Sequence, residues 1–139
     1  MIINPIIKTL LNRKSIREYT DRDPSDEVVE TVVRAGQQAP FAYQMGNLLL
    51  SRERTKNPFR APLFFVICVD SRRHESIMSR CGWEMVQNDL SLLLFGIQDA
   101  TLMAENLVIA AESLGMGSCF LGNVPYHAER YVERFKLPS

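Results

Sequence analysis

A helix formed by residues 99–114 would carry apolar side chains around nearly its whole circumference. Its apolar members are Ala100, Leu102, Met103, Ala104, Leu107, Val108, Ile109, Ala110, Ala111 and Leu114. Because such a helix offers water almost no polar face, we expect other parts of the fold to bury it. Its alanines allow close packing against another helix, within one subunit or between two subunits. Gly115 is expected to end the helix in a left-handed conformation.

The neighbouring segments predict the elements that cover this helix. Residues 63–69 form an unbroken run of β-branched and aromatic residues, which is typical of a central strand covered on both faces. Ser25 is expected to cap a helix that continues to about Gln38. The other predicted elements are helices at residues 5–11, 71–80 and 126–135 and strands at residues 48–50 and 118–121. For residues 90–95 the pattern fits either a helix or a strand. We therefore predict an α+β domain, in which helices wrap a small sheet around the central helix.

Composition narrows the classes of function. The 139 residues suffice for one domain, residues 1–139, with a core of its own. Sixteen basic and sixteen acidic residues cancel, so charge gives no reason to expect a nucleic acid or an anionic membrane as partner. No apolar run approaches the roughly 20 residues that span a bilayer, and the N-terminus does not resemble a signal peptide. We expect a cytoplasmic protein.

The cysteine and histidine patterns argue against a metal site. Cys68, Cys81 and Cys119 are widely spaced and form no Cys-x-x-Cys motif. His74 and His127 lie far apart and belong to no ligand pattern. We expect reduced thiols and no bound metal.

Three cations and a hydroxyl group fall within five residues near the start of the chain. They are Arg13, Lys14, Ser15 and Arg17. These groups together suit a phosphate held by charge-assisted hydrogen bonds. The alternative is a solvated surface, or a cluster that stabilises the carbonyl end of the preceding helix. If the cluster binds phosphate, we expect a phosphorylated small molecule as the ligand.

Two further segments suit a flat heterocyclic ligand. Residues 37–47 carry few charges, and the amides of Gln44 and Asn47 can both donate and accept hydrogen bonds. Residues 114–123 contain glycines for a tight turn, and Gly122 would let a backbone N–H approach a flat ligand. Each segment also fits an ordinary loop, or a helix end followed by a strand bulge. Since no acid–base pair, nucleophile elbow or glycine-rich phosphate loop is present, no catalytic side chain is predicted, and an enzyme would rely on a bound cofactor.

Taken in order, four segments resemble the nitroreductase family of FMN-dependent oxidoreductases. Arg13-Lys14-Ser15-Ile16-Arg17-Glu18-Tyr19 resembles the family's opening motif, Arg-Arg-Ser-x-Arg-x-(Phe/Tyr). Ala39-Pro40-Phe41-Ala42-Tyr43-Gln44 stands where the family has Ala-Pro-Ser-(Ser/Ala)-x-Asn. Residues 99–115 resemble the family's long core helix, and residues 117–122 resemble the strand that follows it. The order and spacing agree across nearly the whole chain.

The resemblance implies a nitroreductase-like fold with a mainly antiparallel sheet. It also implies that the FMN phosphate and ribityl chain are held by Arg13, Lys14, Ser15 and Arg17. The isoalloxazine ring would be lined by Pro40, Phe41 and Ala42, with Gln44 at its polar edge, and by Leu121, Gly122 and Asn123, with a backbone N–H near N5. Family members are usually homodimers with FMN at the interface. NAD(P)H reduces the flavin, which then reduces a nitroaromatic, quinone or related small-molecule acceptor in a ping-pong cycle.

Departures from the family pattern leave a second hypothesis open. Phe41 replaces a small hydroxyl residue and Gln44 replaces an asparagine, so hydrogen bonds at the ring edge are expected to differ. The sequence stops at Ser139, and we expect the family's C-terminal strand and basic tail to be missing. The alternative to an enzyme is therefore a non-catalytic flavin-binding module or a truncated structural relative. A third hypothesis keeps the flavin and changes the reaction, for example to reductive dehalogenation or azoline oxidation.

Overall fold

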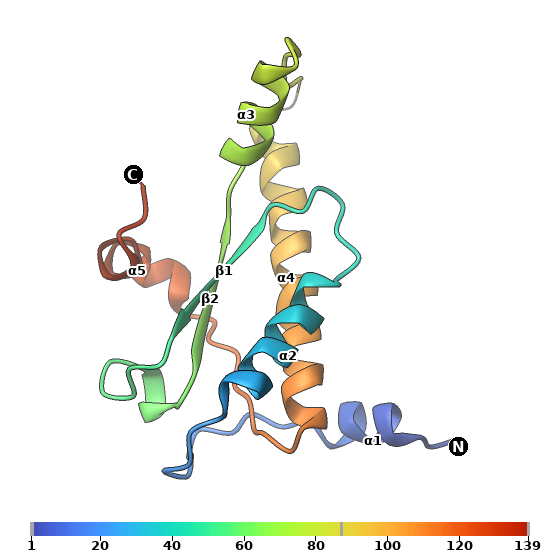
Figure 1. Ribbon diagram of the computed structural model, residues 1–139, viewed down its shortest axis with the longest axis vertical. Helices are drawn as coiled ribbons and strands as arrows, with labels where there is room; N and C mark the ends of the chain where they lie inside the picture. Colours follow the sequence, from blue (N-terminus) through green and yellow to red (C-terminus); the bar gives the residue numbers. More distant parts are fainter. Residues whose placement is uncertain (1, 87, 139) are drawn as a thin grey trace.

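The computed structural model, which describes residues 2–86 and 88–138, places a small two-stranded sheet between helices (Figure 1). Helices α2 and α4 lie side by side and α4 packs against the sheet, whereas α5 contacts the other face near the hairpin loop. The elements are α1 (Pro5–Asn12), α2 (Asp26–Gln37), β1 (Gly46–Ser51), η1 (Pro58–Arg60), β2 (Phe64–Val69), α3 (Arg72–Arg80), α4 (Asp89–Ser113), η2 (Val124–His127) and α5 (Ala128–Phe135). The predicted α+β class is confirmed.

Strands β1 and β2 form an antiparallel pair, in which the side chains of β2 alternate between the two faces. Phe65 and Ile67 pack against the core on the α4 side, and the Phe64 ring lies 5.7 Å from the Tyr131 ring of α5. Coverage of both faces is therefore confirmed for these residues. The prediction of a central strand is wrong for the part of the chain described, because β2 pairs with β1 alone.

The buried core joins α2 to α4. Its buried cluster consists of Val32, Ala39, Met103 and Leu107. A Cβ atom added to Gly36 would lie 2.8 Å from Leu107 Cγ, so glycine lets the two helices approach closely here. This close packing fixes the end of α2 relative to the middle of α4.

Helix α2 begins as predicted, because the Ser25 hydroxyl accepts a hydrogen bond from the Val28 N–H at 3.4 Å.

Helix α4 is longer than the sequence pattern predicts. It runs without a break through residues 90–95, and Asn88 caps it by accepting a hydrogen bond from the Ser91 N–H at 2.8 Å. The expectation that no apolar run is long enough to span a membrane is wrong, because α4 passes that test of length and composition. The finding is weak, since the core helix of a soluble protein passes the same test and α4 packs against α1, α2 and both strands.

Only one side of α4 is covered within a single chain. The buried residues among those described are Gly96, Asp99, Met103 and Leu107. A second set is more than half exposed: Leu90, Leu93, Leu94 and Ile97. Within the predicted helix at residues 99–114, Leu102 and Leu114 are exposed and most other apolar residues are half-buried. The prediction of burial around the whole circumference is therefore wrong for one copy of the chain.

Residues 118–121 do not form the predicted strand. Ser118 makes a single parallel bridge with Ser15, and neither residue belongs to the two-stranded sheet. An apolar run of suitable length indicates a strand but does not supply its pairing partner. Gly115 does end the preceding turn in the predicted left-handed conformation, with φ of 81°. The last predicted helix is shorter than expected, because its first residues lie in the 3₁₀ turn η2.

Candidate functional site

Residues 13–19 leave the end of α1 as an extended segment beside residues 117–118. The Ile16 N–H donates a hydrogen bond to the Ser118 carbonyl at 2.8 Å. A Cβ atom at Gly117 would lie 2.7 Å from Ile16 Cγ1, so this approach depends on glycine. The Tyr19 hydroxyl closes the segment by donating to the Ile16 carbonyl at 2.8 Å. Two of the predicted ligand-binding segments are thus brought together within one chain.

The two arginines of this segment lie against aromatic rings. The Arg13 guanidinium is 5.2 Å from the centre of the Phe120 ring, and the Arg17 guanidinium is 5.9 Å from the centre of the Phe59 ring. Across residues 2–86 and 88–138, neither arginine makes an ion pair with a carboxylate. Arg17 and Ser15 are exposed and Arg13 is half-buried. Each aromatic ring orients a guanidinium group without neutralising its charge. Both groups can therefore still pair with an anionic ligand.

Lys14 lies in different surroundings from the two arginines. It lines a shallow depression of about 320 Å³ together with Ile16, Glu112 and the turn at residues 115–117. Arg13, Ser15 and Arg17 do not line this depression. Alternation along an extended segment accounts for the difference, because successive side chains point to opposite sides.

The pKa of Tyr19 is raised above its ordinary value. Burial is the main cause, the nearby Cys119 adds to it, and Arg17 acts in the opposite direction. The phenol is protonated at neutral pH even at its ordinary pKa, and the raised pKa keeps it protonated to more alkaline pH. The hydroxyl therefore remains the donor that fixes the segment next to Arg17.

A larger cavity of about 830 Å³ is lined by Phe59, the ring against which Arg17 lies, but by none of Arg13, Lys14, Ser15 and Arg17. Leu121 and Asn123, both predicted to bind ligand, line it together with Phe59. The remaining lining residues come from the hairpin loop and from η2 and α5: Thr55, Lys56, Asn57, Pro58, His127, Arg130, Tyr131, Glu133 and Arg134. Gly122 is exposed, and a Cβ atom there would meet nothing within 4 Å, so no neighbour in this chain requires glycine at that position.

The hairpin loop that carries Phe59 is held by a polar network that sequence reasoning missed. Arg134 of α5 donates to the Ser51 hydroxyl at 2.6 Å, to Asn57 Oδ1 at 2.8 Å and to the Lys56 carbonyl at 2.9 Å. Asn57 is only 6% exposed and donates to the carbonyls of Ser51 and Ala61. Asn57 is therefore a buried anchor in a loop whose other residues are mostly charged. The Asn-Pro pair was the one local sign of an ordered turn here.

Arg54 links the same loop to the segment before α2. Its guanidinium donates to the carbonyls of Thr20, Arg22 and Arg60 and pairs with Asp23 at 2.7 Å. Phe59 and Arg60 have positive φ values, 53° each, which are rare for residues other than glycine. Several contacts from outside the loop thus hold a strained turn that presents Phe59 to Arg17.

Residues 40–44 form the other predicted half of the site, and a buried carboxylate in α4 holds them. Asp99 is fully buried and accepts hydrogen bonds from the backbone N–H groups of Ala42, Tyr43 and Met45 at 2.7, 3.1 and 3.0 Å. Pro40, Ala42 and Gln44 are exposed, and Phe41 packs against the core cluster. Sequence reasoning used Asp99 only as a helix boundary.

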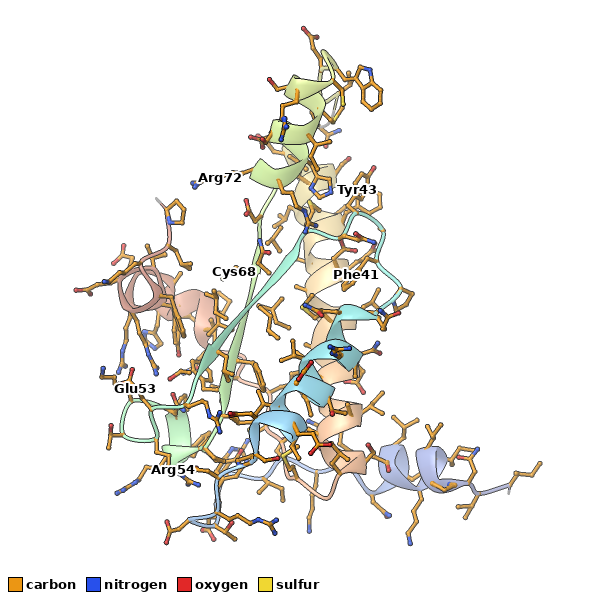
Figure 2. The ribbon with its side chains drawn as sticks, in the orientation of Figure 1. Phe41, Tyr43, Glu53, Arg54, Cys68 and Arg72 are labelled. Atoms are coloured by element: carbon orange, nitrogen blue, oxygen red, sulfur yellow. The ribbon has the colours of Figure 1, made fainter. Side chains whose placement is uncertain are left out.

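The two halves of the predicted site lie apart in a single chain. Residues 40–44 follow the C-terminal end of α2, whereas the segment held by Arg54 precedes its N-terminal end. A 12-residue helix is about 18 Å long. Figure 2 shows Phe41 and Tyr43 well above Arg54 along the long axis of the molecule. One chain therefore does not bring all the predicted ligand-binding residues together.

Comparison with known proteins gives the same family from sequence and from structure. The family model described as "Nitroreductase family" matches residues 10–52 and 44–139. A curated FMN reductase (NADPH) of Bacillus subtilis is 29% identical over 154 residues, and a chromium(VI) reductase of Pseudomonas sp. is 32% identical over 149 residues. The alignments cover 99% and 96% of this chain. The chain spans 61% of the length of each of these two relatives.

Solved structures agree with this match. Nitroreductase A from Vibrio parahaemolyticus superposes with a TM-score of 0.85 at 28% identity, over 99% of this chain and 64% of that one. The NADPH:FMN oxidoreductase from Vibrio harveyi, solved in complex with NAD⁺, has a TM-score of 0.83 at 28% identity, over 98% of this chain and 64% of that one.

Proposed function

This chain belongs to the nitroreductase family, and we propose that it acts as an FMN-dependent oxidoreductase that takes electrons from NAD(P)H. Its acceptor would be a nitroaromatic, a quinone or a similar small molecule. The observation that carries the proposal is that, among the described residues, Arg13 and Arg17 make no ion pair with a carboxylate and each lies against an aromatic ring. One of these rings, Phe59, also lines a cavity of about 830 Å³, a suitable size for a cofactor. The names of the relatives, which include FMN reductases and a nitroreductase, support it.

The donor set of the chain fits the phosphate of FMN. Arg13 and Arg17 would provide charge-assisted hydrogen bonds, and the exposed Ser15 hydroxyl lies between them in the sequence. Lys14 would attract the phosphate only at long range, since its side chain lines the depression on the opposite side of the segment from Arg13 and Arg17. The aromatic rings of Phe120 and Phe59 would keep the two guanidinium groups in place.

The flat ring of a flavin would lie in the cavity lined by Phe59, Leu121 and Asn123. Leu121 and Phe59 supply apolar surface, and Asn123 supplies an amide. The exposed backbone at Gly122 would be free to donate a hydrogen bond to the ring, as the family resemblance implies. When bound, FMN would supply the redox chemistry, which is hydride transfer from NAD(P)H and then to the acceptor in a ping-pong cycle.

A second copy of the chain would complete the site. Pro40, Phe41, Ala42 and Gln44 cannot reach the arginines of their own chain, because the length of α2 separates them. The exposed stripe of α4 at Leu90, Leu93, Leu94 and Ile97 has the spacing of a helix face that packs against another protein surface. We therefore propose a homodimer with FMN at the interface, in the cytoplasm, where the free cysteines would stay reduced.

The separation of the two halves also favours the alternative function. A lone chain could hold a flavin through Arg13 and Arg17 alone and perform no turnover, as a flavin-binding module. Steady oxidation of NAD(P)H with FMN and a quinone acceptor separates the two functions. Turnover supports the oxidoreductase, and flavin binding without turnover supports the non-catalytic module. Absence of both flavin binding and turnover would rule out both.

A further inference from the structure

Asp99 is a carboxylate in the most apolar helix of the chain. It is 0% exposed, and its neighbours along the inner face of α4 are Gly96 and Met103. A carboxylate in such surroundings is unfavourable unless hydrogen bonds compensate it. Its partners lie 54 to 57 residues away in the sequence, in the loop after α2. The residue therefore links the core helix to one particular loop.

The three bonds to Asp99 determine which groups the loop can offer to a ligand. The N–H groups of Ala42, Tyr43 and Met45 point inward to the carboxylate and are not free to bind a ligand. Arg73 holds the loop from the other side by donating to the Gln44 carbonyl, and Gln44 itself has a left-handed φ of 55°. The exposed groups are the side chains of Ala42, Tyr43 and Gln44.

We propose that Asp99 is a positioning residue, which fixes the backbone of residues 42–45 so that Ala42 and Gln44 present a rigid surface to the flavin ring. This inference rests on the proposed function, in which residues 40–44 line the ring. Asp99 does not touch the ligand itself. It acts through three backbone bonds, so its effect is on the shape of the loop.

The test compares Asp99→Asn with Asn106→Ala as the matched control. Asparagine keeps the size of the side chain, but it replaces one acceptor oxygen by an NH₂ donor. That donor would face backbone N–H groups, so at least one hydrogen bond to residues 42–45 is lost. Asn106 also lies on α4 and donates to the Ala35 carbonyl at 3.1 Å, so its removal breaks a bond to α2 and none to the loop. Both variants lose a link made by α4, and only one loses the link to residues 42–45.

Amide hydrogen exchange of the flavin-free chain gives the first readout. In Asp99→Asn, the amides of residues 42, 43 and 45 should exchange at least tenfold faster than in the wild type, with unchanged protection in α2. Asn106→Ala should leave the exchange of these three amides unchanged. Wild-type rates in Asp99→Asn would overturn the proposal. If that variant does not fold, the wild type alone tests the proposal. Fast exchange of the wild-type amides of residues 42 and 43 would overturn it.

Binding of FMN gives the second readout. Asp99→Asn should raise the Kd for FMN at least tenfold and shift the visible absorption band of the bound flavin, whereas Asn106→Ala should reproduce the wild-type band. The wild-type Kd and band in Asp99→Asn would contradict a positioning role. If the wild type itself binds no FMN, the proposed function is wrong, and the exchange rates alone decide whether Asp99 fixes the loop.

Discussion

At the scale of single residues, the chain leaves cations where a ligand can use them. Arg34, Arg52 and Arg54 each pair with a carboxylate, whereas Arg13 and Arg17 lie against aromatic rings. A ring orients a guanidinium group without neutralising it. Arg134 also lies against aromatic rings, but its guanidinium donates hydrogen bonds to Ser51 and Asn57. Across residues 2–86 and 88–138, the side chains of Arg13 and Arg17 have ring contacts without such bonds, which leaves their donors for a ligand.

Replacing Arg17 by alanine should weaken FMN binding. Loss of a charge-assisted hydrogen bond removes about 1.5–3 kcal/mol, or roughly 10- to 100-fold in Kd. Fluorescence quenching of FMN measures the effect. Arg34→Ala serves as control, since Arg34 pairs with Glu30 on the exposed face of α2 and should leave the Kd unchanged. Equal affinity of Arg17→Ala and the wild type would contradict the phosphate-binding role.

The thiol of Cys68 should react slowly and only at alkaline pH. Burial, and secondarily the nearby Asp70, raises the pKa of Cys68 above its ordinary value, so less thiolate is present at any given pH. At about pH 8.5, near the ordinary thiol pKa, we expect iodoacetamide to alkylate the exposed Cys81 before Cys68. Mass spectrometry of the modified peptides measures both. Equal rates at that pH would show that the pKa shift is absent.

Single residues also show which parts of the site the sequence could predict and which it could not. Clustered cations are visible in the sequence, and so the sequence predicts Arg13 and Arg17 as phosphate ligands, a role that stays a prediction. Asp99 and Arg134 act through partners more than 50 residues away, and no local pattern reports such contacts. Each looked like an ordinary helix residue.

At the scale of elements, local signals predicted helices better than strand pairing. Ser25 and Gly115 set the expected helix boundaries, because capping depends on nearby residues. Whether residues 118–121 form a strand depends on a partner that the local sequence does not contain. The full length of α4 was missed because residues 90–95 alone are too short to distinguish helix from strand.

The link between α5 and the hairpin loop should contribute to stability. Replacing Arg134 by methionine removes its hydrogen bonds to Ser51, Asn57 and the Lys56 carbonyl. We expect the free energy of unfolding to fall by about 1–3 kcal/mol, because partly buried polar groups lose their donor. Urea denaturation measures the change.

Arg130→Met is the matched control on the same helix. Arg130 is exposed, and its replacement should change the free energy of unfolding by less than about 0.5 kcal/mol. If the two variants were equally stable, the network around Asn57 would have no special role in holding the loop.

At the scale of the whole molecule, the main feature is a site in two parts and a core helix with one uncovered side. The segment with Arg13 and Arg17 precedes α2 in the chain and lies beside Ser118, residues 40–44 follow the end of α2, and the Leu93–Leu94 side of α4 is exposed. Pairing of two copies would cover the helix and could bring the two parts together. The family resemblance implied FMN at a homodimer interface, but the sequence did not indicate which of the predicted site residues one chain would hold apart.

Replacing Leu94 by glutamate should disrupt this pairing. Leu94 is 54% exposed in the single chain, and a charge there would be buried unpaired in an interface that includes α4. Analytical ultracentrifugation should give two copies for the wild type and one for the variant. Ile77→Glu, at an equally exposed site on α3, should behave as the wild type. A wild type that stays monomeric would refute the homodimer.

The most direct test of the proposed function is a titration of the wild-type chain with FMN. Fluorescence quenching monitors binding, and the absorbance of the protein after desalting shows whether flavin is retained. We predict saturable quenching at one FMN per chain and a retained yellow flavin band. No quenching and no retained absorbance with FMN in excess would contradict the flavin-binding role of Arg13 and Arg17, and with it the proposed function.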